Sequence, residues 1–97
     1  MQALMVTGLF RYEPCNLQIK NKVLQVQFLK SERTLNISAL TEAVLIRNKS
    51  GMHRLRLSTP YEQYEFLADD EITAKETVSF MMELIENSSG LEIRSIE

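Results

Sequence analysis

The chain has 97 residues, of which 44% are hydrophobic and 25% charged, and it contains only two prolines and three glycines. This length fits one domain over residues 1–97, and the composition excludes a disordered or low-complexity chain. The net charge of −2 hides an asymmetry. Residues 1–56 carry nine Lys/Arg and three Asp/Glu, or +6, whereas residues 57–97 carry two and ten, or −8. Such a division bears on partners and not on the fold.

Cysteine usage and the lack of long apolar runs predict an intracellular protein. The lone Cys15 can form no internal disulfide and has no second cysteine for a thiolate metal site, which favours a reducing compartment. The first 14 residues lack the basic region of a signal peptide, and no stretch reaches the roughly 20 apolar residues of a membrane span. We therefore expect a nuclear or cytoplasmic domain without a metal or cofactor.

Apolar residues alternate with polar ones from about residue 3 to residue 67, which predicts seven short antiparallel strands. In the first strand Leu4 to Tyr12 alternate on one face, and Pro14 is expected to end it because proline cannot donate to a ladder. A turn is expected around Asn21. The later strands are centred on residues 17–19, 24–28, 35–39, 43–47, 53–59 and 61–66.

The period changes to that of a helix over residues 70–87. Its apolar face is expected to consist of Ala74, Val78, Met81, Met82 and Ile85. The tail at residues 91–97 either adds a short strand or leads into further sequence. The predicted fold is α+β and mostly β: a seven-stranded antiparallel barrel or sandwich capped by one C-terminal helix.

No group of residues carries the pattern of an active site. Cys15 and His53 stand 38 positions apart on different predicted strands, and neither has a local partner motif. The acidic residues 69–71 at the helix start complement the helix dipole. No phosphate loop, dinucleotide fingerprint or zinc spacing is present. We expect a protein that is not an enzyme.

The most informative cluster is basic and falls in one predicted hairpin. It contains Arg47, Lys49, His53, Arg54 and Arg56, and the alternation places Arg54 and Arg56 opposite two leucines. Such a hairpin would attract an acidic peptide, an inositol phosphate headgroup or a nucleic-acid backbone, or it is an ordinary solvated strand face. Direct nucleic-acid binding is disfavoured, because exposed aromatic residues are not interleaved and the domain is acidic overall.

Seven strands followed by one amphipathic helix resemble the pleckstrin-homology-like (PH-like) family over nearly the whole chain. The layout is also similar to the N-terminal PH domains of the TFIIH core-subunit family, in the segments LMVTGLFRYE, NLQIKNKVLQVQF, LNISAL, LRLST, YEF and MMELIENSS. This resemblance implies an adaptor or scaffold in a nuclear transcription and DNA-repair assembly that docks acidic segments of activators and repair factors or contacts other subunits of the assembly. By position, the implied contact residues are Arg47, Lys49, Arg54, Arg56 and Gln63.

Two alternatives stay open. A membrane-surface adaptor would capture a phosphorylated lipid headgroup through Arg11, Lys20 and Lys22 at the open end of the barrel, although the dense lysine cluster of phosphoinositide-binding PH domains is missing. A self-associating scaffold would place the basic half of one copy against the acidic half of another.

Overall fold

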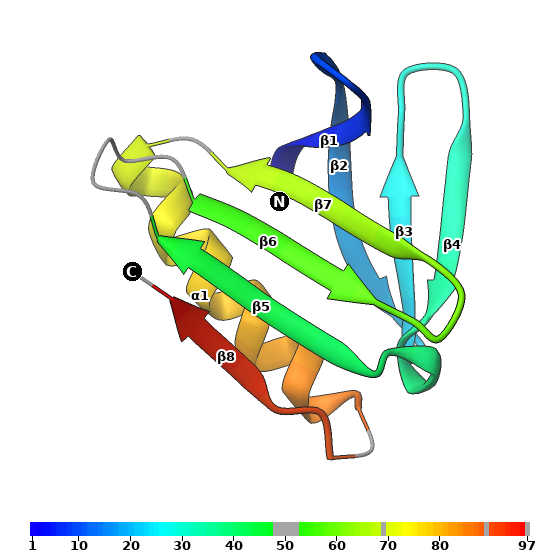
Figure 1. The fold of residues 1–97 in the computed structure, drawn as a ribbon, viewed down its shortest axis with the longest axis vertical. Helices are drawn as coiled ribbons and strands as arrows, with labels where there is room; N and C mark the ends of the chain where they lie inside the picture. Colours follow the sequence, from blue (N-terminus) through cyan, green and yellow to red (C-terminus); the bar gives the residue numbers. More distant parts are fainter. Residues whose placement is uncertain (48–52, 69, 89, 97) are drawn as a thin grey trace.

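The computed structural model describes residues 1–47, 53–68, 70–88 and 90–96. Within these residues the chain forms eight strands, one 3₁₀ turn, η1 (Ile37–Ala39), and one helix, α1 (Asp70–Glu86) (Figure 1). The domain is therefore α+β and mostly β, as the alternation predicts. The strands are β1 (Gln2–Gly8), β2 (Arg11–Lys20), β3 (Val23–Gln27), β4 (Glu32–Asn36), β5 (Glu42–Arg47), β6 (His53–Ser58), β7 (Gln63–Ala68) and β8 (Ile93–Ile96).

The eight strands belong to one sheet with the order β4-β3-β2-β1-β7-β6-β5-β8. All neighbours are antiparallel except β5 and β8, which run parallel. The prediction of seven antiparallel strands is therefore wrong by one strand, because the tail pairs with β5. The sheet is not closed into a barrel, since β4 and β8 are its two edges.

The first predicted strand covers β1 and the start of β2, which are joined by a turn at Leu9 and Phe10, and the second predicted strand is the rest of β2. Phe10 has a φ of 59°, a left-handed conformation that sequence rules reserve for glycine or asparagine. Pro14 lies inside β2 and does not end a strand. The ladder between β2 and β3 begins only at Asn16, so β2 has a free edge at Pro14, and a strand tolerates proline at a free edge. The expected turn at Asn21 is confirmed by positive φ angles of 54° at Asn21 and 63° at Lys22.

The fourth strand ends earlier than the alternation predicts. It stops at Asn36, and η1 follows where Ile37 and Ala39 were expected to extend the strand. The Asn36 side chain accepts a hydrogen bond of 3.1 Å from the backbone N–H of Ser38, which caps this turn. Ile37 is nevertheless buried, so its apolar character reflects the core and not a strand.

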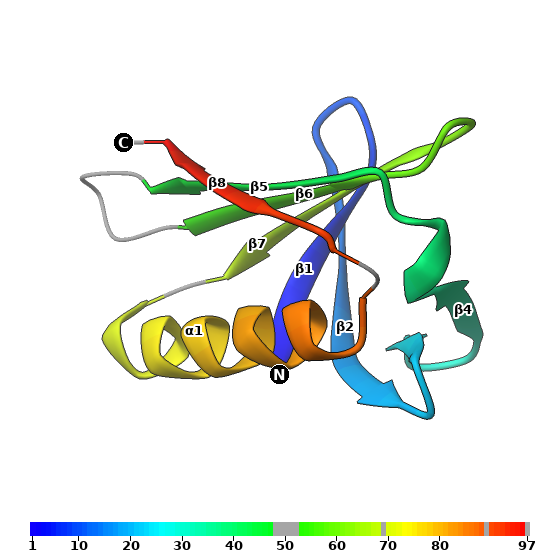
Figure 2. The same cartoon turned by 90° about the horizontal axis from the view of Figure 1, so that it is seen from below.

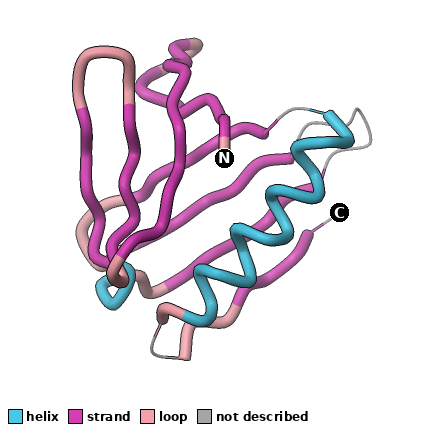
Figure 3. Tube along the Cα trace, turned by 180° about the vertical axis from the view of Figure 1, so that it is seen from behind, coloured by secondary structure: helices cyan, strands magenta, loops and turns pink. Residues whose placement is uncertain are grey.

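Helix α1 packs against one face of the part of the sheet formed by β5, β6, β7 and β8 (Figures 2 and 3). Among the helix residues whose side chains the structure describes, Phe80, Met81 and Leu84 are buried in the core cluster. Of the residues expected on that face, Met81 is buried, whereas Met82 and Ile85 are 59% and 46% exposed. The side chains of Ala74 and Val78 lie outside the described part of the chain. The bounds of the helix agree with the prediction to within one residue, but its buried face is rotated, because Phe80 and Leu84 at i and i+4 define it.

Side chains of β6 and β7 alternate between the core and the opposite side of the sheet, as predicted. Leu55 and Leu57 are 3% and 0% exposed and point to the side of α1, and Tyr64 and Phe66 also contribute to this side. The core therefore lies between the concave side of the sheet and the helix. The opposite side of β5, β6, β7 and β8 is called the outer face below; in Figure 2 no element covers it at β5, β6 and β8.

Candidate interaction surface

Two basic side chains stand on the outer face because β6 alternates strictly. Arg54 and Arg56 occupy the positions on either side of the buried Leu55. On the neighbouring strand β7, Gln63 and Glu65 share this face. The structure thus brings Arg54, Arg56 and Gln63 together on one face of two adjacent strands.

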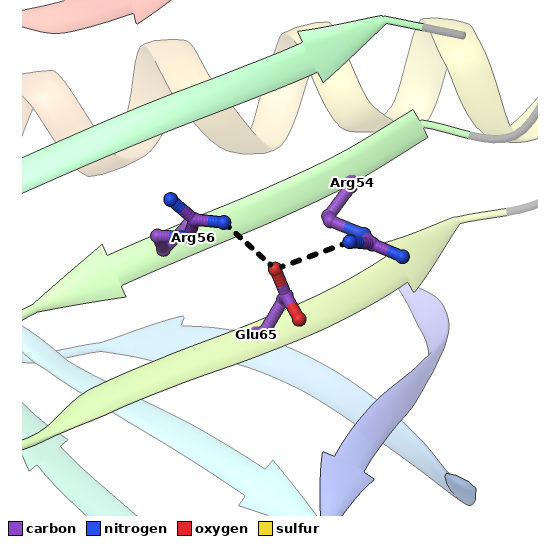
Figure 4. A network of polar contacts seen from close by, with 3 residues as sticks. All are labelled: Arg54, Arg56 and Glu65. Atoms are coloured by element: carbon purple, nitrogen blue, oxygen red, sulfur yellow. Dashed lines mark hydrogen bonds and ion pairs between the residues drawn. The ribbon is translucent and has the colours of Figure 1, made fainter. Parts of the chain in front are cut away.

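Glu65 is an acceptor for both arginines (Figure 4). Arg56 lies directly opposite Glu65 in the register, and its Nη2 donates a hydrogen bond of 3.3 Å to Oε1. Arg54 lies diagonally, with 3.7 Å between Nη1 and the same Oε1. The arginine side chains are 45% and 36% exposed and Glu65 is 22% exposed. Two guanidinium groups therefore share one carboxylate oxygen at a surface open to solvent.

Sequence reasoning did not include Glu65 in the site. Its signal was present in the alternation of β7, where Glu65 lies between the inward Tyr64 and Phe66. What the sequence could not supply is the register, which pairs Arg56 with Glu65 and Arg54 with Leu67. A solvent-facing glutamate is common, and only the pairing makes this one a partner of the basic cluster.

The other predicted contact residues are placed only in part. Arg47 ends β5, and its backbone pairs with His53, whereas Lys49 lies outside the described residues. Gln63 is exposed and pairs with Ser58. His53 is half-buried, and its Nδ1 atom is buried with no hydrogen-bond partner in the described part of the chain.

The outer face also carries apolar residues, which is unusual for a sheet face turned to water. Val44 and Leu67 are 2% and 8% exposed, yet neither belongs to the main core cluster. Val44 lies between Arg56 and Arg94 in the register, and the aliphatic stems of arginines can cover such a residue. Ile96 on β8 is 48% exposed. The arginines of this face therefore stand among apolar neighbours.

A second ion pair crosses the edge of the same face. Nη2 of Arg94 on β8 donates a hydrogen bond of 2.7 Å to Oε1 of Glu42 on β5. Both side chains are well exposed, at 65% and 46%. In contrast to Arg54 and Arg56, this arginine has a carboxylate of its own.

The residues of the predicted lipid site do not gather at one end of the sheet. Lys20 and Lys22 flank the turn between β2 and β3, but Arg11 begins β2. Arg11 and Lys20 are the two ends of this 10-residue strand, which corresponds to a separation of roughly 30 Å. The expectation that all three surround one opening is therefore not met, although each is exposed.

Cys15 and His53 are kept apart by the sheet order. Cys15 lies on β2 and His53 on β6, with β1 and β7 between these strands. Cys15 is a buried free thiol, 3% exposed, and burial away from water raises its pKa above the ordinary value of 9.0. A raised pKa keeps the thiol protonated, which is the opposite of an activated nucleophile.

Comparison with known proteins adds no family to this description. No protein-family model matches the chain, and no curated protein matches it significantly. Within the described residues, none of the helical segments has the length and apolar character that a membrane crossing requires.

Proposed function

We propose that this domain is a non-catalytic protein-interaction module that docks acidic peptide segments on the outer face at Arg54 and Arg56. It would serve as an adaptor within a larger intracellular assembly. A PH-like architecture of the TFIIH core-subunit kind, and with it a nuclear location, belongs to the same proposal. The architectural part is supported by the succession of β1 to β7 followed directly by α1.

The single observation that carries the proposal is that two arginines share one carboxylate. Glu65 can neutralise only one of the two charges, so one positive charge remains for an external acid. Guanidinium groups bind carboxylates through several directed N–H donors, which supports acidic side chains as the partner groups. Gln63 on the same face adds a neutral donor and acceptor.

Charge alone would give weak binding. Each exposed charge pair contributes about 0.2 to 1 kcal/mol, so two such pairs fall well short of micromolar affinity. Among the apolar residues described on this face, the exposed Ile96 offers further contact area. A suitable partner is therefore an acidic segment that also carries an apolar side chain.

The experiment is a fluorescence titration with a labelled 20-residue peptide that alternates Asp/Glu with single Phe and Leu residues. A second peptide with Asn and Gln in place of the acids is the probe control. R54Q/R56Q should weaken binding of the acidic peptide at least fivefold, whereas R11Q, an exposed arginine on β2, should leave it unchanged. Equal affinity for the two peptides, or equal loss in R11Q, would refute the proposal.

Amide chemical shifts provide a map of the contact. The acidic peptide should shift resonances of β6 and β7, with the largest changes between residues 54 and 65. Binding should weaken as salt is raised from 20 to 500 mM, because exposed charges are screened within about 10 Å at 0.1 M salt. Shifts confined to the turn between β2 and β3 would point instead to the lysines there.

A further inference from the structure

The helix presents to solvent a surface that differs from its buried side. Met82 and Ile85 are 59% and 46% exposed on α1, and Glu83 and Glu86 are exposed beside them. A helix turns by 100° per residue, so Met82 and Glu86 share the side opposite Leu84. No described residue covers this apolar and acidic strip, which we call the helix strip (Met82, Glu83, Ile85 and Glu86).

The outer face has the complementary character. Among the described side chains of this face, Arg54, Arg56 and Arg94 carry three positive charges against the two carboxylates of Glu42 and Glu65. The described residues of the face also include an exposed large apolar side chain, Ile96, which is 48% exposed. One surface is thus apolar and negative, the other apolar and positive, and both belong to the same chain.

We propose that a second copy of this chain docks its helix strip on the outer face, so that copies associate head to tail. The acidic side chains Glu83 and Glu86 of one copy approach the arginines of the next, and Met82 packs near Ile96. Charge complementarity selects this occupant, since two outer faces or two helix strips brought together would oppose like charges.

The positions of the two surfaces determine the kind of assembly. α1 covers one side of the sheet and the outer face is the other side (Figure 2), so the two surfaces point away from each other. A contact between different surfaces of the same chain is heterologous, and it forms open chains unless the rotation closes a ring. We therefore expect association that continues beyond a dimer as concentration rises.

The contact is small. α1 has 17 residues and a length of about 25 Å, and only one side of it takes part. One helix face on a short sheet covers less than the roughly 1,200 Å² of stable interfaces. We expect weak association, visible at high protein concentration and low salt, and weakened by salt because both surfaces are exposed.

The test is sedimentation velocity from 0.05 to 1 mM protein in 20 and 500 mM NaCl, with one variant for each surface. M82K/E86K alters the helix strip, and R54E/I96E alters the outer face. L29K/E32K is the matched control, because it also replaces one exposed apolar residue and one exposed glutamate by lysine, at Leu29 in the turn between β3 and β4 and at Glu32 at the start of β4. Circular dichroism tests whether each variant is folded. If R54E/I96E is unfolded, R94E is used in its place.

The wild type and L29K/E32K should exceed the mass of a dimer at 1 mM in low salt and return to the monomer mass of 11.2 kDa in high salt. M82K/E86K and R54E/I96E should each be monomeric alone, but a mixture should form dimers and nothing larger, since each variant keeps one intact surface. A monomeric wild type, an unaffected M82K/E86K, or a mixture that stays monomeric would overturn the proposal.

This association is separate from the peptide function, although it occupies the same face. M82K/E86K should bind the acidic peptide as tightly as the wild type does, because the helix strip lies on the other side of the sheet. Loss of association with retained peptide binding therefore identifies the helix strip. Failure of peptide binding in a chain that still associates would refute only the peptide proposal.

Discussion

Arg56 faces Glu65 directly across β6 and β7, and its guanidinium donates a hydrogen bond of 3.3 Å to the Glu65 carboxylate. This intramolecular carboxylate occupies the position that an acidic partner would take. The internal pair and the proposed external contact are therefore in competition, and weakening one should strengthen the other.

We expect E65Q to bind the acidic peptide more tightly, by two- to fivefold, because both arginines lose the negative charge of their internal partner. The estimate follows from about 0.2 to 1 kcal/mol for an exposed charge pair. The same fluorescence titration measures this change, with E32Q on the exposed part of β4 as the control for net charge. Weaker or unchanged binding in E65Q would show that Glu65 does not compete for the site.

The rotated face of α1 gives a prediction on stability. Leu84 is completely buried and Met82 is 59% exposed, although both are apolar and lie two positions apart. L84A should lower the free energy of unfolding by about 2 to 5 kcal/mol through the cavity that it leaves. M82A should change it by less than about 0.5 kcal/mol. Urea denaturation at neutral pH distinguishes these values, and similar losses in the two variants would contradict the orientation of the helix.

The thiol of Cys15 makes stability depend on pH in the alkaline range. Its pKa is raised by burial away from water, partly offset by a hydrogen bond from the Met5 backbone. The folded state therefore keeps its proton at pH values where the unfolded thiol, with a pKa of 9.0, has lost it. The contribution of this thiol to the free energy of unfolding is complete below pH 9, and it is lost as the pH rises toward the pKa of the thiol in the folded state.

The corresponding measurement compares the wild type with C15A between pH 8 and pH 10. The free energy of unfolding of the wild type should fall relative to that of C15A above pH 9. The pKa of Tyr64 is also raised, mainly by its hydrogen bond to Glu62. Because both proteins contain this tyrosine, the difference between their free energies of unfolding reports on the thiol alone. A constant difference over this range would show that the thiol does not titrate differently in the two states.

Strand β8 covers an edge of β5 that would otherwise be open. A chain ending at Gly90 lacks β8, and we expect faster hydrogen exchange at the β5 amides that face it. An uncovered edge also offers a template for pairing with other chains, so the shortened chain should aggregate more readily. The control is R94Q, which removes the ion pair to Glu42 and keeps the strand. Unchanged exchange in the shortened chain would mean that β8 contributes no protection.

Periodicity predicted the inward and outward positions of β6 and β7 correctly, because Leu55 and Leu57 alternate with arginines without interruption. It failed at Leu9 and Phe10, where the apolar pattern continues through a turn that contains no glycine at the positive φ. It also failed for α1, where several apolar residues in a row left the direction of the buried face undetermined. Only packing against the sheet selects Phe80 and Leu84 over Met82 and Ile85.

The candidate surface shows the same division between local and non-local information. The arginines of β6 are visible in the sequence because they alternate within one strand. Their relation to Glu65, Val44 and Ile96 depends on which strands pair and in what register, and β8 joins β5 from the other end of the chain. The alternation within a strand specifies which side a residue faces, but it does not specify its neighbours across the sheet.

The pairing of β8 with β5 has a consequence for the order of folding. Arg94 and Glu42 are 52 positions apart, and β6, β7 and α1 lie between them in the chain. Closing so long a loop costs entropy before the contact contributes any stability, whereas the pairs from β1 to β4 and from β5 to β7 join strands that follow one another in the chain. We therefore expect the β5–β8 pair to form after the pairs between consecutive strands, as does the β1–β7 pair, in which Leu4 faces Leu67. Until β8 joins, β5 has an open edge that can pair with a strand of another chain. The rate at which β8 joins, and not the stability of the folded domain, is then expected to determine how often newly made chains aggregate.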